Sequence, residues 1–374
     1  MTHGDPYSDR LERAQTRMAE EDIDGLVLFP SVNLYYLTGF HEEPAERHFF
    51  LFLTPDDHAV VAPTMYLDQF QEEASLSEIY PWDDGEDPMA KTTEAMEEIG
   101  LTGTDGRVLL DDTMFALFSL DIQDVLPDAE FDLASSLLGE MRLVKDEYEI
   151  ESLREAARIS DEVSEAIRAL GVDAVGMTER DLVNEMRKLF DERGGDGFSF
   201  EPIAGSGPKG AHPHYRYGDR TIGSGEPVIL DFGTSVRGYP GDQTRTVVFD
   251  GKPPEDFHDI YDTVLEAFEA AVAAVQPGVE AQEVDRAARA VIEDAGYGEQ
   301  FLHRTGHGLG LEVHEPPYIV EGNDQELAAG MVHSVEPGIY LEGRFGVRIE
   351  DIVVVTEDGC ERLNDSTKTW KPLD

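Results

Sequence analysis

Two aspartates, Asp231 and Asp242, border two apolar runs in the stretch VILDFGTSVRGYPGDQTRTVVF, residues 228–249. Asp231 ends the first run, and Asp242 stands just before the second, which begins at Thr244. The glycines and the proline between them predict a turn, so the stretch is typical of a β-hairpin. A hairpin of this length can bring the two carboxylates to one point. An unpaired buried charge is costly, so an aspartate that ends an apolar strand favours a functional role over a turn residue.

A second unusual segment, HRTGHGLGLEVHEPP at residues 303–317, carries three histidines among three glycines. One histidine alone is more often a core or surface residue, but three among glycines predict a backbone that bends closely around a bound group. Glu336 and Glu350 stand in two apolar runs that predict strands, residues 332–341 and 347–356. The second run is apolar nearly throughout, so we expect Glu350 to be buried and to need a cation or a proton.

Taken together, these features predict a metal site of four carboxylates and one imidazole, without sulfur. Such a set suits Mn²⁺, and with one imidazole also Co²⁺, Zn²⁺ or Fe²⁺. Four carboxylates exceed what one divalent ion needs, so we predict two ions, with Mn²⁺ or Co²⁺ favoured. Two ions that share a water lower its pKa and polarise a carbonyl, which allows amide hydrolysis without a Ser or Cys nucleophile. The candidate ligands are Asp231, Asp242, His307, Glu336 and Glu350.

The pattern of apolar runs predicts two domains, and 374 residues are long enough for two cores. In the first part, an amphipathic helix at residues 8–24 precedes strands at residues 25–29, 48–54 and 58–63. This mixture predicts an α/β domain over residues 1–140.

The second part, over residues 141–374, alternates longer helices with strands and predicts an α+β domain. A long amphipathic helix at residues 146–170 opens it. The further helices are predicted at residues 179–193, 254–275 and 281–295, and the strands at 228–232, 244–249, 332–341 and 347–356.

Charge is the outstanding feature of the composition: 79 acidic residues face 29 basic ones, for a formal net charge of −50. Such a surface repels nucleic acid and anionic lipid, so we expect neither as a partner. No apolar stretch approaches the ~20 residues of a membrane span, and the first residues lack the apolar core of a signal peptide. The only cysteine is Cys360, which excludes a disulfide within the chain. We therefore expect a cytoplasmic protein.

The five candidate ligands and their surroundings resemble those of the "pita-bread" metallopeptidases, and most of all the Xaa-Pro dipeptidases (prolidases) and aminopeptidases P. In the first part, NLYYLTG at residues 33–39 resembles the creatinase-type N-terminal domain of the same group. The resemblance implies a creatinase-like α/β domain followed by a pita-bread α+β catalytic domain. The matching motifs are P-H-Y at 213–215, D-x-G at 231–233, D-x-T-R-T at 242–246, G-H-G-x-G at 306–310, H-E-x-P at 314–317, E-P-G-I-Y at 336–340 and V-R-I-E-D at 347–351.

The resemblance also implies a function and a role for each ligand. The protein would cut the bond before proline in Xaa-Pro dipeptides or short peptides, as a homodimer. Asp231 would bind one ion, His307 and Glu336 the other, and Asp242 and Glu350 would bridge them. Glu336 would in addition act as the general base.

Five further residues would serve the substrate. His214 and His314 would steady the tetrahedral intermediate and the departing proline nitrogen. Arg348 would orient the ligands or meet a substrate carboxylate. His303 and Tyr215 would line the pocket for the proline ring.

Other functions stay open because the sequence departs from the pattern at a position that bears on the length of the substrate. Some dipeptidases of this group carry an arginine shortly after the His-Glu pair, which holds the carboxylate of the dipeptide; here Tyr318 follows. An aminopeptidase P that acts on longer Xaa-Pro peptides is therefore the alternative. A non-catalytic pita-bread binding protein and a metal-free creatinase-like amidinohydrolase are more distant, because such proteins lack the ligands.

The acidic residues are spread along the whole chain, which favours a surface adapted to high salt. We expect the melting temperature to rise from roughly 0.1 M to above 1 M KCl, because added ions screen repulsion between surface carboxylates. Scanning calorimetry across this range measures the effect. A melting temperature that stays level or falls would show that the acidic surface is no such adaptation.

Overall fold

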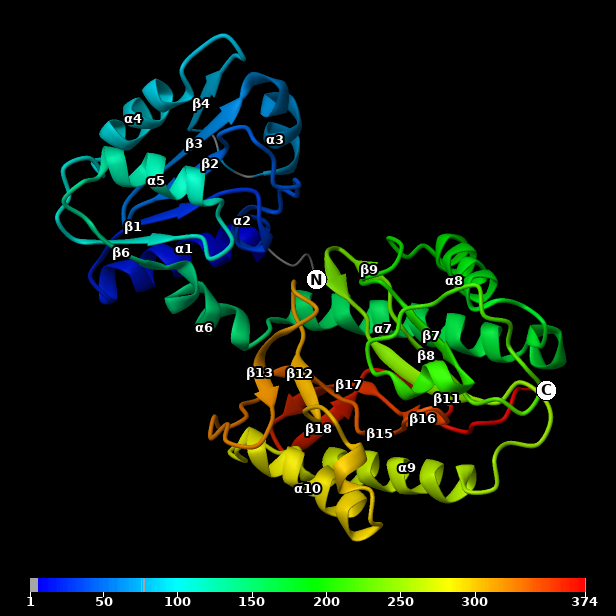
Figure 1. The fold of residues 1–374 in the computed structure, drawn as a ribbon. Helices are drawn as coiled ribbons and strands as arrows, with labels where there is room; N and C mark the ends of the chain where they lie inside the picture. The colour runs from blue at the N-terminus through cyan, green and yellow to red at the C-terminus, as the bar shows by residue number, and fades with distance from the viewer. Residues whose placement is uncertain (1–5, 75, 77, 374) are drawn as a thin grey trace. The chain divides into compact units, whose positions relative to one another are not determined.

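The computed structural model describes residues 6–74, 76 and 78–373. It contains two compact units, of which the first ends at Arg142 and the second begins at Leu143 (Figure 1). Among the described residues, no helix is both long and apolar enough to cross a bilayer.

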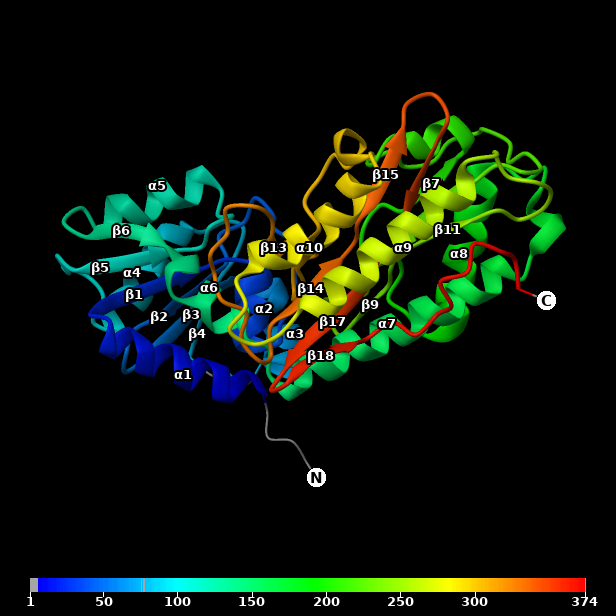
Figure 2. The same cartoon turned by 90° about the horizontal axis from the view of Figure 1, so that it is seen from below.

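The first unit is built on a six-stranded mixed sheet in the order β4-β3-β2-β1-β5-β6. On one face, Met96 and Phe118 of helices α4 and α5 pack against Val27 and Phe50 of the sheet, while α1 lies over the other face (Figure 2). The strands are β1 (Ile23–Leu28), β2 (Phe50–Leu53), β3 (His58–Pro63), β4 (Ile79–Trp82), β5 (Arg107–Leu110) and β6 (Glu130–Leu133). The helices are α1 (Pro6–Glu20), α2 (Val32–Thr38), α3 (Leu67–Glu73), α4 (Pro88–Glu98), α5 (Ala116–Val125) and α6 (Leu138–Leu143).

The helix predicted at residues 8–24 is shorter than expected, because α1 ends at Glu20 and β1 begins at Ile23. Asp22 lies between them with a φ of 54°, a left-handed conformation that reverses the chain and ends the helix. The strand predicted at residues 58–63 is confirmed.

The second unit holds four long helices around two main sheets, of order β11-β8-β7 and β13-β12-β14-β17-β18. Its helices are α7 (Glu147–Arg168), α8 (Glu179–Arg193), α9 (Phe257–Ala274) and α10 (Ala281–Asp294). Its strands are β7 (Ile203–Ser206), β8 (Val228–Phe232), β9 (Ser235–Val236), β10 (Tyr239–Pro240), β11 (Gln243–Val247), β12 (Gly306–Gly308), β13 (Glu315–Ile319), β14 (Val332–Val335), β15 (Gly338–Leu341), β16 (Phe345–Arg348), β17 (Asp351–Thr356) and β18 (Gly359–Arg362).

Helix α7 supports both sheets. Its residues Leu153 and Ala157 pack against Ile352 of β17, whereas Val353 packs with residues of α9 and α10. Figure 2 shows α7 and α9 on opposite sides of β17. Further along, α7 joins α8 in covering the three-stranded sheet. The predicted helix at residues 146–170 is thus confirmed, with a capping box between Asp146 and Glu149 at its start.

The hairpin predicted around Asp231 is confirmed, since β8 and β11 pair antiparallel with Asp231 opposite Thr244. The single strands predicted at residues 332–341 and 347–356 are wrong. The first divides into β14 and β15 at Glu336-Pro337, where the proline offers no N–H to a ladder. The second divides into β16 and β17 at Ile349-Glu350, where the Glu350 N–H donates to the carbonyl of Thr244 instead.

The segment after β18 is fastened to α7 by Arg168, whose side chain is fully buried. Its guanidinium donates hydrogen bonds to the carbonyl oxygens of Thr367, Thr369 and Lys371. Burial lowers the pKa of Arg168 to about 10, so the group stays charged at neutral pH.

We expect Arg168→Met to lower the free energy of unfolding by about 3 kcal/mol or more, because three carbonyl groups lose a charged donor at ~1–3 kcal/mol each. Urea titration should show a lower midpoint with an unchanged slope. The control is Arg362→Met, which removes an exposed ion pair with Glu269 and should cost about 1 kcal/mol at most. Equal losses in the two variants would show that Arg168 does not hold this segment.

Candidate metal centre

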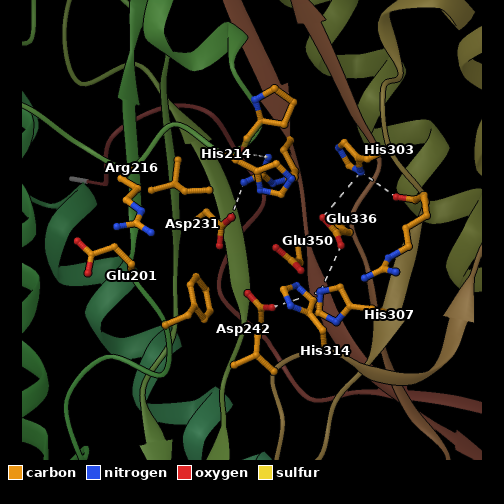
Figure 3. Close-up of a pocket in the computed structure, with 16 residues that line it drawn as sticks. Glu201, His214, Arg216, Asp231, Asp242, His303, His307, His314, Glu336 and Glu350 are labelled. Atoms are coloured by element: carbon orange, nitrogen blue, oxygen red, sulfur yellow. Dashed lines mark hydrogen bonds and ion pairs between the residues drawn. The ribbon is translucent and has the colours of Figure 1, made fainter. Parts of the chain in front are cut away.

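A pocket of about 560 Å³ opens between the β11-β8-β7 sheet and the five-stranded sheet (Figure 3). All five candidate ligands line it, and each comes from a different place in the fold. Asp231 lies near the end of β8, Asp242 directly before β11, and His307 at the centre of β12. Glu336 and Glu350 stand at the two strand breaks described above. The whole lining is Phe200, Glu201, Ile203, Pro213, His214, Arg216, Asp231, Asp242, His303, Arg304, His307, Val313, His314, Glu336, Arg348 and Glu350.

The ligand atoms of these residues converge. Asp242, His307 and Glu350 each offer one atom, and these atoms lie within 4.8 Å of one another. Nε2 of His307 is 3.8 Å from Oδ2 of Asp242 and 3.4 Å from Oε1 of Glu336. Oδ1 of Asp231 and Oδ1 of Asp242 are buried without a hydrogen-bond partner among the described residues. Buried carboxylate oxygens that face one another without donors fit a divalent cation.

Burial and mutual repulsion shape the protonation of the acidic ligands. Desolvation, with repulsion from Asp231 and Glu336, raises the pKa of Asp242 well above its usual range. Desolvation and repulsion from Asp242 raise the pKa of Glu350 in the same way. For Glu336, desolvation raises the pKa to about 7, although the charge of Arg348 opposes the shift. Without a bound cation, this pocket therefore retains protons at neutral pH.

His307 is prepared to act as a neutral ligand. Desolvation lowers its pKa to about 3, so the ring carries no charge at neutral pH. Nδ1 lies 3.2 Å from the carbonyl oxygen of Gly308. A donated Nδ1–H places the lone pair on Nε2, the atom that faces Asp242 and Glu336.

Polar neighbours hold Glu350 in place. The hydroxyl of Thr244 donates to Oε2 of Glu350 at 2.6 Å. Nη1 of Arg245 donates to the Glu350 carbonyl oxygen at 2.6 Å, and its Nη2 donates to Asp351 at 2.8 Å. The D-x-T-R-T and V-R-I-E-D motifs are therefore joined in space, and this join fixes the position of one candidate ligand.

Arg348 orients Asp231. Its buried guanidinium donates from Nη2 to Oδ2 of Asp231, from Nη1 to the hydroxyl of Tyr340 at 2.6 Å, and from Nε to Thr244 at 3.0 Å. A longer bond of 3.4 Å from Nη1 reaches the carbonyl oxygen of Pro213. Four of the five N–H groups are thus engaged. Arg348 is expected to orient the ligands or to meet a substrate carboxylate. Its guanidinium binds the candidate ligand Asp231, and among the described residues one N–H group is left for a substrate carboxylate.

The three histidines expected to serve the substrate all line the pocket. The ring of His314 lies 4.1 Å from that of His307, edge to face, and desolvation and the charge of Arg304 lower its pKa. His214 lies beside Asp231 (Figure 3). Nε2 of His303 lies 2.8 Å from the hydroxyl of Tyr340, which extends the chain of hydrogen bonds that begins at Arg348.

Tyr215 differs from the expectation, because it does not line the pocket. Its hydroxyl donates to Oε2 of Glu179 at 2.7 Å, and the charge of Lys209 lies over its ring. Glu179 is fully buried at the start of α8 and binds Ser206 and Gly218 as well. Tyr215 therefore belongs to a structural hydrogen-bond network behind the pocket wall.

Several residues in and around the pocket are not among those predicted from the sequence. Arg304 lines the pocket, and its place inside the histidine segment is a signal for it. Tyr340, part of the E-P-G-I-Y motif, supports the pocket by binding both Arg348 and His303. Phe200, Glu201 and Arg216 lie outside the argued motifs, and only the folded chain brings them to the site.

Comparison with models of known protein families gives two matches that divide the chain between them. Residues 10–144 match "Creatinase/Prolidase N-terminal domain", and residues 151–357 match "Metallopeptidase family M24". The second match contains all five candidate ligands.

Similar proteins match over nearly the whole chain. "Probable dipeptidase PepE" of Mycobacterium tuberculosis is 40% identical, with 96% of this chain and 94% of that protein covered. "Xaa-Pro dipeptidase" of Lactobacillus delbrueckii subsp. lactis is 35% identical, with 97% and 98% covered. Among solved structures, a recombinant prolidase from Thermococcus sibiricus is 38% identical with a TM-score of 0.91, and 99% of this chain and 100% of that chain are covered.

The raised pKa of Glu336 predicts how pH affects the stability of the metal-free protein. The pKa is about 7 in the folded state against 4.5 in the unfolded chain, so between these values the folded state holds a proton that the unfolded state has lost. The free energy of unfolding is therefore full below pH 4.5 and falls as pH rises through 7, by about 1.4 kcal/mol per pH unit for each such proton.

Denaturant titration of chelator-treated protein from pH 5 to 8 measures this loss. The control variant Glu336→Gln cannot bind this proton, so its free energy of unfolding should decline less steeply with pH. Identical declines in the wild type and the variant would contradict the raised pKa.

Proposed function

This chain belongs to metallopeptidase family M24, and on that premise we propose that it is an Xaa-Pro dipeptidase, a hydrolase that uses two divalent metal ions to cut the peptide bond before proline. The observation that carries the proposal is the convergence of four carboxylates and one neutral imidazole on a single pocket. Their mutual repulsion is costly and serves no purpose in a protein that has lost catalysis. The matches to an Xaa-Pro dipeptidase and to a prolidase support the substrate class.

In this proposal Asp231 would hold one ion, His307 and Glu336 would hold the other, and Asp242 and Glu350 would hold both. The unpaired buried oxygens of Asp231 and Asp242 and the neutral Nε2 of His307 support this assignment. Oxygen-rich ligands with one imidazole favour Mn²⁺ or Co²⁺, with Zn²⁺ and Fe²⁺ as alternatives. When bound, the two ions supply a water nucleophile of lowered pKa and polarise the carbonyl group under attack.

Residues of the chain move the protons and hold the developing charge. Glu336 accepts the proton of the attacking water at its carboxylate and returns it to the proline nitrogen as the C–N bond breaks. His314 and His214 donate hydrogen bonds to the oxygen of the tetrahedral intermediate and to the departing nitrogen. His303, fixed by Tyr340, lines the space for the proline ring.

Aminopeptidase P activity on longer peptides is the second candidate, because Tyr318 occupies the position where some dipeptidases have an arginine. The dipeptidase is favoured, since a cation is still present in the pocket at Arg304. We also propose that the protein forms a homodimer, as the family resemblance implies. Its location is proposed to be cytoplasmic and its acidic surface to be adapted to high salt.

The test compares Leu-Pro with Leu-Pro-Gly after removal of metals and addition of Mn²⁺ or Co²⁺ in high KCl. We expect the dipeptide to be cut with the higher kcat/KM, and we expect two ions per chain by elemental analysis. Asp242→Ala should lose a bridging ligand and with it activity by roughly 10³-fold or more, with the fold preserved by circular dichroism. An enzyme that cuts only the tripeptide is an aminopeptidase, and saturation at one ion per chain would contradict the two-metal site.

A further inference from the structure

Three arginines line the pocket, and their hydrogen bonds differ. Arg348 is engaged by Asp231, Tyr340 and Thr244, as described above. The guanidinium of Arg304 has no hydrogen bond or ion pair among the residues that the structure describes, although its backbone oxygen lies 2.8 Å from Nδ1 of His303. A guanidinium has five N–H donors, so Arg304 presents a full set to whatever enters the pocket.

The ring of Tyr318 holds Arg304 in place. The guanidinium carbon lies 4.3 Å from the centre of this ring, a cation–π contact. The two residues come from paired segments, because the N–H of Thr305 donates to the carbonyl oxygen of Ile319 at 3.1 Å. This contact uses none of the N–H groups of the guanidinium in a hydrogen bond, and a pair of such N–H groups matches a carboxylate.

Arg304 lies on the side of the pocket where the proton is transferred. It follows His303 directly in the chain, and Nδ1 of His303 lies 4.0 Å from Oε2 of Glu336. Arg216, the third arginine, is exposed and lies with Glu201 beyond Asp231, on the opposite side from Glu336 and His307 (Figure 3).

We propose that Arg304, in contact with the ring of Tyr318, binds the C-terminal carboxylate of an Xaa-Pro dipeptide. The inference rests on the proposed function, in which Glu336 returns a proton to the proline nitrogen. The proline must therefore lie on the Glu336 side of the pocket, and its carboxylate is only one residue beyond the broken bond. Arg304 is the cation on that side with free donors, whereas Arg216 lies across the pocket and Arg348 is already engaged.

The roles of the two residues follow from this arrangement. Arg304 selects dipeptides, since a longer peptide carries no charge at that position. Tyr318 is a positioning residue. It stands where some dipeptidases have an arginine, and its ring contacts the guanidinium of Arg304 from the paired segment. The departure of the sequence from its family at Tyr318 is thus matched by Arg304.

The experiment compares Leu-Pro with its neutral amide, leucyl-prolinamide, on the metal-loaded enzyme. Arg304→Met should raise KM for Leu-Pro by roughly 10- to 100-fold, as expected when a charged hydrogen-bonding partner is lost, with a much smaller change in kcat. The same variant should treat the amide much as the wild type does, so the preference for the acid over the amide disappears. Elemental analysis should still find the wild-type metal content.

Three further variants keep the inference open to contradiction. Tyr318→Phe retains the aromatic face and should keep the preference for Leu-Pro over its amide, whereas Tyr318→Leu should weaken this preference several-fold. The Tyr318 variants therefore test the inference even if Arg304→Met folds poorly. Arg216→Met should retain the preference for the acid. If Arg304→Met retains it, or if Arg216→Met removes it, the assignment is wrong while the dipeptidase activity stands. A wild-type enzyme that cuts neither substrate would instead overturn the proposed function itself.

Discussion

Repulsion between four carboxylates in one pocket is the constraint on which the rest of the catalytic unit depends. Desolvation raises the pKa of each of them, and three also feel the repulsion of acidic neighbours. Without a bound cation, the folded chain must keep protons on these carboxyl groups. When cations bind, the carboxyl groups can release these protons. Hydrogen bonds hold these residues in place against their repulsion: Arg348 binds Asp231, Thr244 binds Glu350, and Arg245 binds the backbone of Glu350.

The same constraint accounts for local features of the backbone. Glycine is required on both sides of His307, because a Cβ on Gly306 would stand 2.0 Å from the carbonyl oxygen of Ser334, and one on Gly308 would stand 2.2 Å from that of Pro316. The neighbouring strands can therefore approach closely and bury the imidazole. The breaks at Glu336 and Glu350 have a related effect, because each carboxylate lies where the chain leaves one sheet for another and is aimed into the pocket instead of along a strand face.

Much of this could be predicted from the sequence, and the reason differs from element to element. The hairpin that carries Asp231 and Asp242 and the helix α7 follow from local patterns of apolar residues and turns. The strand breaks are harder to predict, because apolar residues continue on both sides of each. Pro337 is a local signal for the first break, whereas the second depends on the tertiary hydrogen bond from the Glu350 N–H to Thr244. The P-H-Y motif predicts Tyr215 in the pocket, but a motif does not show which way a side chain points. The hydroxyl of Tyr215 instead binds Glu179, on a distant helix. Arg304 stands within the histidine segment, but its contact with Tyr318 appears only when β12 and β13 pair.

Anomalous diffraction from crystals grown with Mn²⁺ tests the central claim, a two-metal centre formed by these five side chains, most directly. The expected difference map has two peaks among Asp231, Asp242, His307, Glu336 and Glu350, roughly 3.5–4 Å apart. A single peak, or peaks that lie away from these residues, would contradict it.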